Sequence, residues 1–405
     1  MKTGHTPSRS EPEYWEDCEI PWFTLADVWQ LREGRVYLGE TAEKISRLGL
    51  ANSAAELLPA GTVVLSRTAS VGFSGIMPAP MATSQDFWNW VPRSQILPEY
   101  LLYLFRAMTQ VFQRLTMGST HKTIYQPDAA RLCICVPPPD EQRAIADFLD
   151  AQTAKIDALV AKKRALIEKL AEKRRALISR VVTSGIGDAR NSLHGWRTVP
   201  LMRLTDPKRP IMYGIVLPGP NVDDGVPIVK GGDVKPGRLA LDSLCKTTFE
   251  IEAGYARSRL KTDDMVFSIR GSIGEVELVP AEIEGANLTQ DAARVAPAAS
   301  VQPRWLLHAL KAESVVGPLL ALSIGAAVRG VNIRDLKRVP IPTPPVEEQR
   351  AIADFLDRET AKIDALVAKV EAAIERLQEY RAALITAAVT GKIDVRGFAP
   401  AAPPA

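Results

Sequence analysis

The chain has 405 residues, 24% of them charged, and a net charge of +3, which is typical of a globular protein with at least two domains. It has no uncharged apolar run of about twenty residues, and its amino-terminal segment lacks the apolar core of a signal peptide. These features argue against a membrane-spanning or secreted protein and favour a cytoplasmic one. The charge permits nucleic-acid binding without indicating it.

Residues 1–136 mix short apolar runs with glycine and proline, as in an α+β domain with a curved sheet. We expect strands at 62–66 and 132–136 and a helix at 97–108. Polar loops between them carry residue types that can contact bases or phosphates. Surface loops often contain such residues for solubility alone. The candidates for DNA contact are Ser66, Arg67, Thr68, Ser70, Thr83, Ser84, Gln85, Thr120 and Lys122.

Residues 137–186 predict one long helix that begins after a proline cluster and ends at glycine. Its apolar residues follow a heptad-like stripe, which indicates packing against another helix. From 151 to 182 it has nine Lys or Arg against three Asp or Glu, a net charge of +6. A solvated face is the ordinary interpretation, and a surface for DNA or an acidic partner is the alternative. The stripe comprises Leu149, Ile156, Leu170 and Leu177.

Residues 187–343 repeat the pattern of the first domain. Strands are expected at 265–269 and 338–342 and a helix at 302–313, again with polar loops between them. The second set of candidates for DNA contact comprises Ser268, Arg270, Ser272, Asn287, Thr289, Gln290, Arg329 and Asn332.

Residues 344–393 predict a second long helix. Five apolar residues, spaced seven apart, make its stripe cleaner than that of the first helix, and residues 358–389 carry no net charge. The tail at 394–405 reads as disordered. The five residues of the apolar stripe in this second helix are Leu356, Ile363, Val370, Leu377 and Leu384.

An internal repeat relates the two halves. Residues 141–186 match 348–393 without a gap at an offset of 207, with 32 identities in 46 positions. Weaker similarity continues upstream, where residues 58–72 lie over 260–274 and residues 83–86 over 288–291. We therefore expect two copies of one domain and two helices packed as an antiparallel coiled coil about a pseudo-twofold axis. A coiled coil that serves only dimerisation is the alternative.

Catalytic and metal-binding signatures are absent from the sequence. It contains no Walker-type loop, no Asn-Pro-Pro-aromatic tetrapeptide, no HExxH and no GxSxG. Its four histidines form no recognisable constellation. The four cysteines read as reduced structural thiols, with metal binding by Cys133 and Cys135 as the minor alternative. The chain therefore reads as a non-catalytic adaptor without a cofactor or metal of its own.

The chain resembles the specificity subunits of Type I restriction-modification systems. The resemblance rests on the helix PPxxEQRAIAxFLDxxTAKIDALVAK, which occurs twice, and on the opening TPSRSEPEYWEDCEIPWFTLADV at 6–28. It implies two target-recognition domains that read the halves of a split site in double-stranded DNA. It also implies paired helices that set the spacing and dock two methyltransferase subunits, with a restriction and translocation subunit joining them. S-adenosylmethionine, ATP and Mg would then be bound by those partners.

One departure from the repeat concerns the start of each half. The second half opens with GWRTVPLMRLTD at 195–206, and the first half has no counterpart. Either the start lies upstream or the first domain lacks its opening strand. Two other functions remain as alternatives: a free-standing pseudo-dimeric DNA-binding regulator and, disfavoured by the missing motifs, an enzyme.

Overall fold

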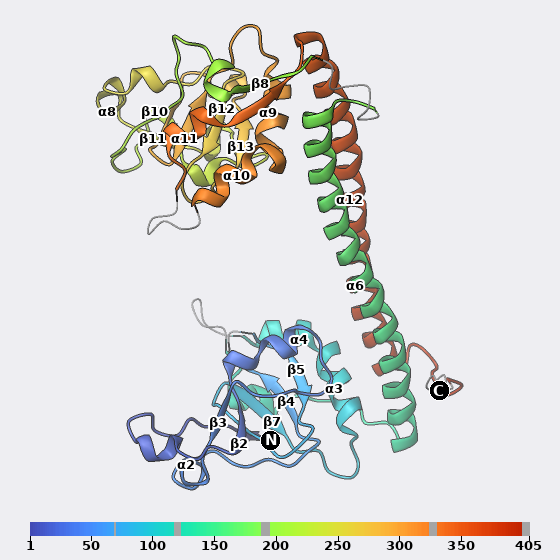
Figure 1. Ribbon diagram of the computed structural model, residues 1–405. Helices are drawn as coiled ribbons and strands as arrows, with labels where there is room; N and C mark the ends of the chain where they lie inside the picture. Colours follow the sequence, from blue (N-terminus) through green and yellow to red (C-terminus); the bar gives the residue numbers. More distant parts are fainter. Residues whose placement is uncertain (69, 117–122, 188–194, 324–329, 399–405) are drawn as a thin grey trace. The chain divides into compact units, whose positions relative to one another are not determined.

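The computed structural model describes residues 1–68, 70–116, 123–187, 195–323 and 330–398 (Figure 1). The chain divides into two compact units, of which the first comprises residues 1–164 and 371–405 and the second residues 165–370. Each unit contains one globular part and about half of each long helix. The domain boundaries predicted from the sequence differ from this division, because they treat each long helix as a separate segment, 137–186 and 344–393.

The globular part of the first unit is built on a four-stranded antiparallel sheet, in the order β1-β7-β4-β5, and a three-stranded mixed sheet, β3-β2-β6. Its strands are β1 (Lys2–Thr3), β2 (Ile20–Phe23), β3 (Glu43–Ile45), β4 (Val63–Ser66), β5 (Ser74–Ile76), β6 (Ala82–Thr83) and β7 (Phe87–Trp90). Its helices are η1 (Pro12–Trp15), η2 (Leu25–Asp27), α1 (Trp29–Arg32), α2 (Arg47–Ala51), α3 (Pro98–Ala107), α4 (Thr109–Leu115) and α5 (Gln126–Ala130), followed by the long helix α6 (Pro139–Ser184).

The second unit repeats both sheets, as β9-β15-β12-β13 and β11-β10-β14, and adds a two-stranded sheet, β16-β8. Its strands are β8 (Arg197–Pro200), β9 (Met212–Tyr213), β10 (Val226–Val229), β11 (Cys245–Thr247), β12 (Met265–Ser268), β13 (Val276–Leu278), β14 (Asn287–Leu288), β15 (Ala292–Val295) and β16 (Pro340–Thr343). Its helices are η3 (Leu201–Arg203), η4 (Gly231–Asp233), η5 (Leu241–Ser243), α8 (Phe249–Ala253), η6 (Ala256–Ser258), η7 (Ala281–Ile283), α9 (Pro303–Lys311), α10 (Glu313–Ser323) and α11 (Ile333–Arg338), followed by the long helix α12 (Val346–Val389).

The predicted α+β fold and the duplication are confirmed. The strands at 62–66 and 265–269 appear as β4 and β12, and the helices at 97–108 and 302–313 as α3 and α9. In each unit the alternate residues of β4 or β12 enter different hydrophobic clusters, because successive side chains of a strand point to opposite faces.

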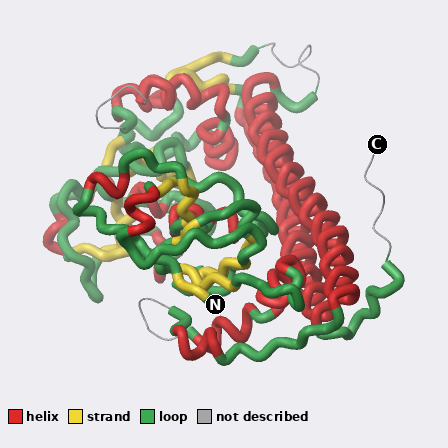
Figure 2. Tube along the Cα trace, turned by 90° about the horizontal axis from the view of Figure 1, so that it is seen from below, coloured by secondary structure: helices red, strands yellow, loops and turns green. Residues whose placement is uncertain are grey.

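The long helices run antiparallel and side by side within each unit (Figures 1 and 2). In the first unit Arg381 pairs with Asp157, and in the second unit Arg174 pairs with Asp364. The two ion pairs are equivalent under the offset of 207. The predicted stripe residues lie in this seam, where all are buried except Leu177 and Leu377, which are partly buried. The antiparallel coiled coil is therefore confirmed.

Each long helix is anchored at its start to the globular part of its own unit. The Gln142 side chain accepts a hydrogen bond from the N–H of Leu97 at 2.8 Å, and Gln349 accepts one from the N–H of Gln302 at 2.9 Å. Both bonds satisfy a backbone donor at the beginning of a second helix, α3 or α9. The glutamine of the repeated EQR motif therefore fixes the helix to the domain.

Two predictions from the sequence are corrected. Residues 132–136 form no strand, whereas the equivalent residues 339–343 contain β16, which pairs with β8. A strand needs a partner, and no described residue supplies one to 132–136. The tail is not disordered at residues 394–398, because Val395 is buried and Phe398 packs edge to face on Phe148. Residues 399–405 lie outside the described residues.

Candidate nucleic-acid interface

Each unit carries the same tight turn at the end of its central strand, β4 or β12. The hydroxyls of Ser66 and Ser268 each donate to the carbonyl two residues ahead, at 3.0 Å. The N–H groups of Gly72 and Gly274 donate back to the carbonyls of those serines, also at 3.0 Å. Both glycines have a φ of about +90°, which side chains rarely adopt. The two turns therefore share these closing hydrogen bonds and the glycine conformation, although their sequences differ.

In each unit, two other segments that follow or carry candidate loops are hydrogen-bonded to this turn. In the first unit, the Arg67 N–H donates to the Asp86 carbonyl at 2.9 Å, and the Arg67 carbonyl accepts from Ile124 at 3.0 Å. In the second unit, Ile269 donates to Asp291 and accepts from Val331, both at 2.9 Å. The loops that the sequence placed in separate segments therefore share one edge of each domain.

The exposed members of the predicted set are Gln85, Arg270 and Asn332. The Arg270 side chain is exposed and makes no hydrogen bond or ion pair with any described residue. Gln85 accepts a hydrogen bond from Thr6 at 2.6 Å. Asn332 caps α11 by accepting from the Arg334 N–H at 2.8 Å.

Arg67, Thr68, Ser272 and Gln290 are half-buried. The Arg67 guanidinium lies over the Trp88 ring, 4.5 Å from its centre. Its Nε is buried and has no hydrogen-bond partner among the described residues. Thr68 donates to Asp86 at 2.7 Å, so this hydroxyl orders the loop.

The remaining described candidates are buried. Asn287 illustrates their role: its amide donates to Glu252 and to the Tyr255 carbonyl, and its oxygen accepts from Ser258 and from the Leu288 N–H. A fully paired buried side chain supports the loop from within. Direct base contact by this group stays an untested prediction. The group comprises Ser66, Ser70, Thr83, Ser84, Ser268, Asn287 and Thr289. Thr120, Lys122 and Arg329 lie outside the described residues.

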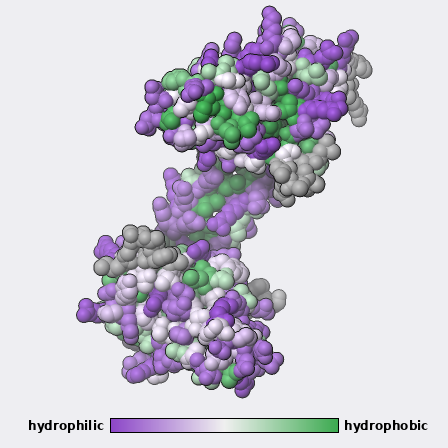
Figure 3. Space-filling view, turned by 90° about the vertical axis from the view of Figure 1, so that its left-hand side faces the viewer, coloured by the Kyte–Doolittle hydropathy of each residue, from purple (hydrophilic) through white to green (hydrophobic). Residues whose placement is uncertain are grey.

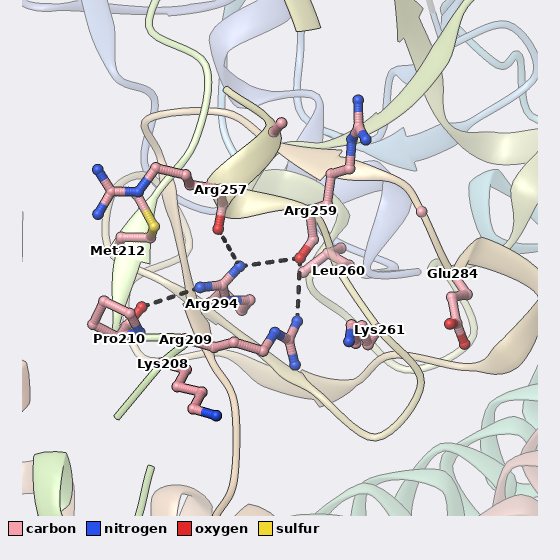
Figure 4. A pocket seen from close by; sticks show the side chains of 12 residues that line it. Lys208, Arg209, Pro210, Met212, Arg257, Arg259, Leu260, Lys261, Glu284 and Arg294 are labelled. Atoms are coloured by element: carbon pink, nitrogen blue, oxygen red, sulfur yellow. Dashed lines mark hydrogen bonds between the residues drawn. The ribbon is translucent and has the colours of Figure 1, made fainter. Parts of the chain in front are cut away.

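The second unit also has a basic pocket that the sequence did not single out (Figure 4). It encloses about 470 Å³ beside Arg294, which is 1% exposed and donates to the carbonyls of Arg257, Arg259 and Pro210. Burial lowers the pKa of Arg294, and its Nε has no hydrogen-bond partner within the part of the chain that the structure describes. Six cationic side chains and one acidic side chain, Glu284, line the pocket; the cations are Lys208, Arg209, Arg257, Arg259, Lys261 and Arg294.

Carboxylates outside the pocket neutralise only part of this charge. Arg209 pairs with Asp264, and Arg259 pairs with Glu252, whose pKa is lowered chiefly by that hydrogen bond. Lys208, Arg257 and Lys261 have no such partner among the described residues. The pocket therefore offers a positive potential suited to a phosphate.

The first unit has an asparagine at the place of Arg294. In the matching sheets, Arg294 lies opposite Val266, and Asn89 occupies the equivalent place opposite Val64. The basic residues are scattered over positions 208–294, which is why no charge run marks them. An arginine in the middle of the apolar run Ala292–Ala296 was the one available signal.

The helix pair carries exposed apolar residues as well as charge, and Figure 3 shows hydrophobic patches among hydrophilic rows on its surface. Leu159 of α6 is 48% exposed, and Leu366 of α12, its equivalent in the repeat, is 44% exposed. Each unit therefore presents the same leucine to solvent. None of the described helices is long and apolar enough to cross a bilayer.

The matched relatives fall into one family. The model of the Type I restriction modification DNA specificity domain matches residues 1–169 and 221–376. The specificity subunit of the Type I restriction enzyme EcoBI from Escherichia coli is 26% identical over 274 residues, which are 64% of this chain and 58% of that protein. The MjaIX specificity subunit from Methanocaldococcus jannaschii is 30% identical over 163 residues, 40% of this chain and 36% of that protein. These matches span less than two thirds of either relative.

Two solved structures share the fold. One, from a study of complex assembly and conformational transition of the type I R-M system, has a TM-score of 0.73 at 18% identity and covers 97% of this chain and 95% of its own. The HsdS subunit from Thermoanaerobacter tengcongensis has a TM-score of 0.52 at 19% identity and covers 92% and 90%.

Proposed function

Because the chain belongs to the family of Type I restriction modification DNA specificity domains, we propose that it is the sequence-reading subunit of such a system. Each unit would read one half of a split, asymmetric site in double-stranded DNA. The alternative is a free-standing DNA-binding regulator, and the same experiment distinguishes the two.

The observation that carries this proposal is the pair of matching loop edges. In both units two further segments are hydrogen-bonded to a turn closed by the same serine and glycine contacts. The side chains presented there differ, with Arg67 over Trp88 in one unit and exposed Arg270 in the other. Arginine can donate two hydrogen bonds to a guanine edge. A common frame with different exposed side chains is suited to reading two different half-sites.

The basic pocket beside Arg294 supports DNA binding by a different contribution. Cations that bind phosphates fix the position of a protein on the duplex without reading its sequence. Lys208, Arg257 and Lys261, which lack carboxylate partners among the described residues, would supply such contacts for the second unit.

The helix pair would act as the spacer and as the dock for methyltransferase subunits. Support comes from the equivalent exposed leucines, Leu159 and Leu366, because the same surface presented twice suits two copies of one partner. The basic stretch of α6 is an alternative contact for DNA. A restriction and translocation subunit would join through the methyltransferase.

Chemistry would reside in the partners. The chain would be non-catalytic, and S-adenosylmethionine, ATP and Mg would be bound by the methyltransferase and translocase subunits. Among the described residues, no group of three or more His, Cys, Asp or Glu is placed to hold a metal ion, and the four cysteines are free.

The decisive experiment is co-expression of the chain with its proposed methyltransferase partner, followed by genome-wide mapping of methylated bases. A split motif methylated only when both proteins are present is the expected result. Exchange of the second unit's loops should change one half of the motif alone. Tight sequence-specific DNA binding by the isolated chain, without any complex or methylation, would instead establish the free-standing regulator.

A further inference from the structure

The first unit has a pocket of about 450 Å³ between its globular part and its two long helices, and every residue that lines the pocket belongs to this unit. The wall comes from α1, the turn between β4 and β5, α3, α4, α6 and α12. Four arginines line the pocket against two carboxylates, so its surface carries an excess of positive charge. The arginines are Arg32, Arg106, Arg164 and Arg381, and the carboxylates are Glu33 and Asp157.

Both carboxylates of the pocket already have arginine partners. Asp157 pairs with Arg381, and Glu33 pairs with Arg35, which does not line the pocket. Arg164 is exposed and makes no hydrogen bond or ion pair with any described residue. The lining arginines that have no carboxylate partner in the described part of the chain are Arg32, Arg106 and Arg164.

Two buried donors of the pocket residues also lack an acceptor. The Nη2 of Arg106 donates to the carbonyls of Gly34 and Arg35, at 3.1 and 2.7 Å, whereas its Nη1 is buried with no hydrogen-bond partner among the described residues. Burial lowers the pKa of Arg106 to about 10. Ser74 is 2% exposed, and its hydroxyl has no described partner either. Because buried donors are normally paired, these two indicate a missing acceptor.

The second unit supplies its own counter-charge at the equivalent place. The offset of 205 between α3 and α9 matches Arg106 with Lys311, which pairs with Glu277 of β13 at 2.8 Å. The equivalent position of β5 is Gly75, which has no side chain to offer. The residue before it, the unpaired serine of the first unit, is replaced by Val276 in the core of the second. The first unit alone therefore combines a buried arginine and a buried hydroxyl with no carboxylate between them.

We propose that this pocket of the first unit binds a phosphate group. Its donors come from several elements and outnumber its free acceptors, which suits a tetrahedral anion with several acceptor oxygens, and arginines bind phosphate through paired, charge-assisted hydrogen bonds. A phosphate group has two sources, a free anion and the DNA backbone. Arg32 donates to Ser70 in the turn after β4 at 2.9 Å, so the pocket adjoins the loop edge described above. The site does not depend on the reading of bases.

The test titrates the full chain with inorganic phosphate at constant ionic strength and measures binding by calorimetry. It uses the chain with Lys208→Gln and Lys261→Gln, which weaken the basic pocket of the second unit. We expect saturable binding of one phosphate. Arg164→Gln should weaken this binding about tenfold, because a charge-assisted contact is lost. The matched control is Lys162→Gln, which removes the same charge from a nearly opposite face of the same helix and should leave phosphate binding unchanged.

Ser74→Ala separates binding from folding. Its hydroxyl has no described partner, so the melting temperature without phosphate should not fall, while phosphate binding should weaken. General damage to the fold would lower both.

Unrelated duplex DNA identifies the source of the phosphate group. Displacement of phosphate by DNA, with a salt slope of DNA binding that R164Q reduces by about 0.9, would assign the site to the backbone. Phosphate that stays bound in the presence of DNA would assign it to a free anion. Absence of saturable phosphate binding together with an unchanged salt slope would overturn the proposal. So would equal losses in R164Q and K162Q, which would indicate diffuse attraction to the basic helix. None of these measurements uses methylation, so they stand apart from the test of sequence reading.

Discussion

Arg381 of α12 donates to both carboxylate oxygens of Asp157 of α6, at 2.9 and 3.2 Å, and the equivalent Arg174 faces Asp364 at 3.3 Å. These reciprocal pairs fix the antiparallel register within each unit. Reversing one charge, by Arg381→Asp, should destabilise the first unit by about 0.2–1 kcal/mol, because the pair is partly exposed. The swap D157R/R381D should recover most of that loss in a double-mutant cycle on denaturant unfolding. A purely additive cycle would mean that the register is set by packing alone.

Two leucines of α6 should separate stability from partner binding. Leu149 is fully buried, so Leu149→Ala should lower the free energy of unfolding by about 2–5 kcal/mol. Leu159 is about half exposed, so Leu159→Lys should leave unfolding nearly unchanged but weaken co-purification of the methyltransferase subunit. Leu366→Lys should do the same, and the double variant should release both copies. Intact complex formation by the double variant would exclude this surface as the dock.

Arg270→Ala should reduce sequence-specific DNA affinity by about 1–3 kcal/mol, the value of a good bidentate base contact. Affinity for unrelated DNA should fall much less. The matched control is Ser268→Ala, which removes the hydroxyl that closes the same turn and should lower the melting temperature instead. Equal losses on specific and unrelated DNA would reassign Arg270 to phosphate contact.

The basic pocket predicts a measurable salt dependence. Replacing Lys208 and Lys261 by Gln should reduce the slope of log affinity against log salt by about 0.9 for each phosphate contact removed. The methylated motif should stay the same, because phosphate contacts position the protein without reading bases. An unchanged slope would mean that the pocket faces away from DNA.

The second unit should lose stability in acid through His308. Its Nε2 lies 2.7 Å from Asp357, and burial lowers its pKa despite that carboxylate, with Lys311 and Arg174 acting in the same direction as burial. A lowered folded pKa means that the unfolded chain binds the proton more readily, so stability falls as the pH drops from about 7 towards 5. The first unit has Tyr103, paired with Asp150, at the equivalent place. His308→Tyr should therefore flatten the pH dependence of the melting temperature, and an unaltered profile would assign the acid sensitivity elsewhere.

The sequence predicted the duplication and the helix pair because both depend on periodicity within one segment. Heptad spacing places Leu149 and Leu356 on buried faces whatever the partner is. The prediction of a strand at 132–136 was wrong, because a strand also needs a partner strand, which comes from a distant part of the sequence. The sequence could not separate exposed loop candidates from buried ones. Ser66 and Gln85 are both polar residues in predicted loops, but Ser66 is buried and Gln85 is exposed. Arg294 was missed because its pocket assembles from separate stretches.

The contacts that gather the three loops run from main chain to main chain, at Arg67 with Asp86 and at Ile269 with Asp291. Side chains that also order the loops, such as Thr68 with Asp86 and the paired Asn287, are buried or half-buried. Exposed side chains on the loops, such as Arg270, can therefore be exchanged without rebuilding the support beneath them. If the units read DNA as proposed, such a frame would let target preference change by substitution at these exposed positions while the helix pair stayed the same.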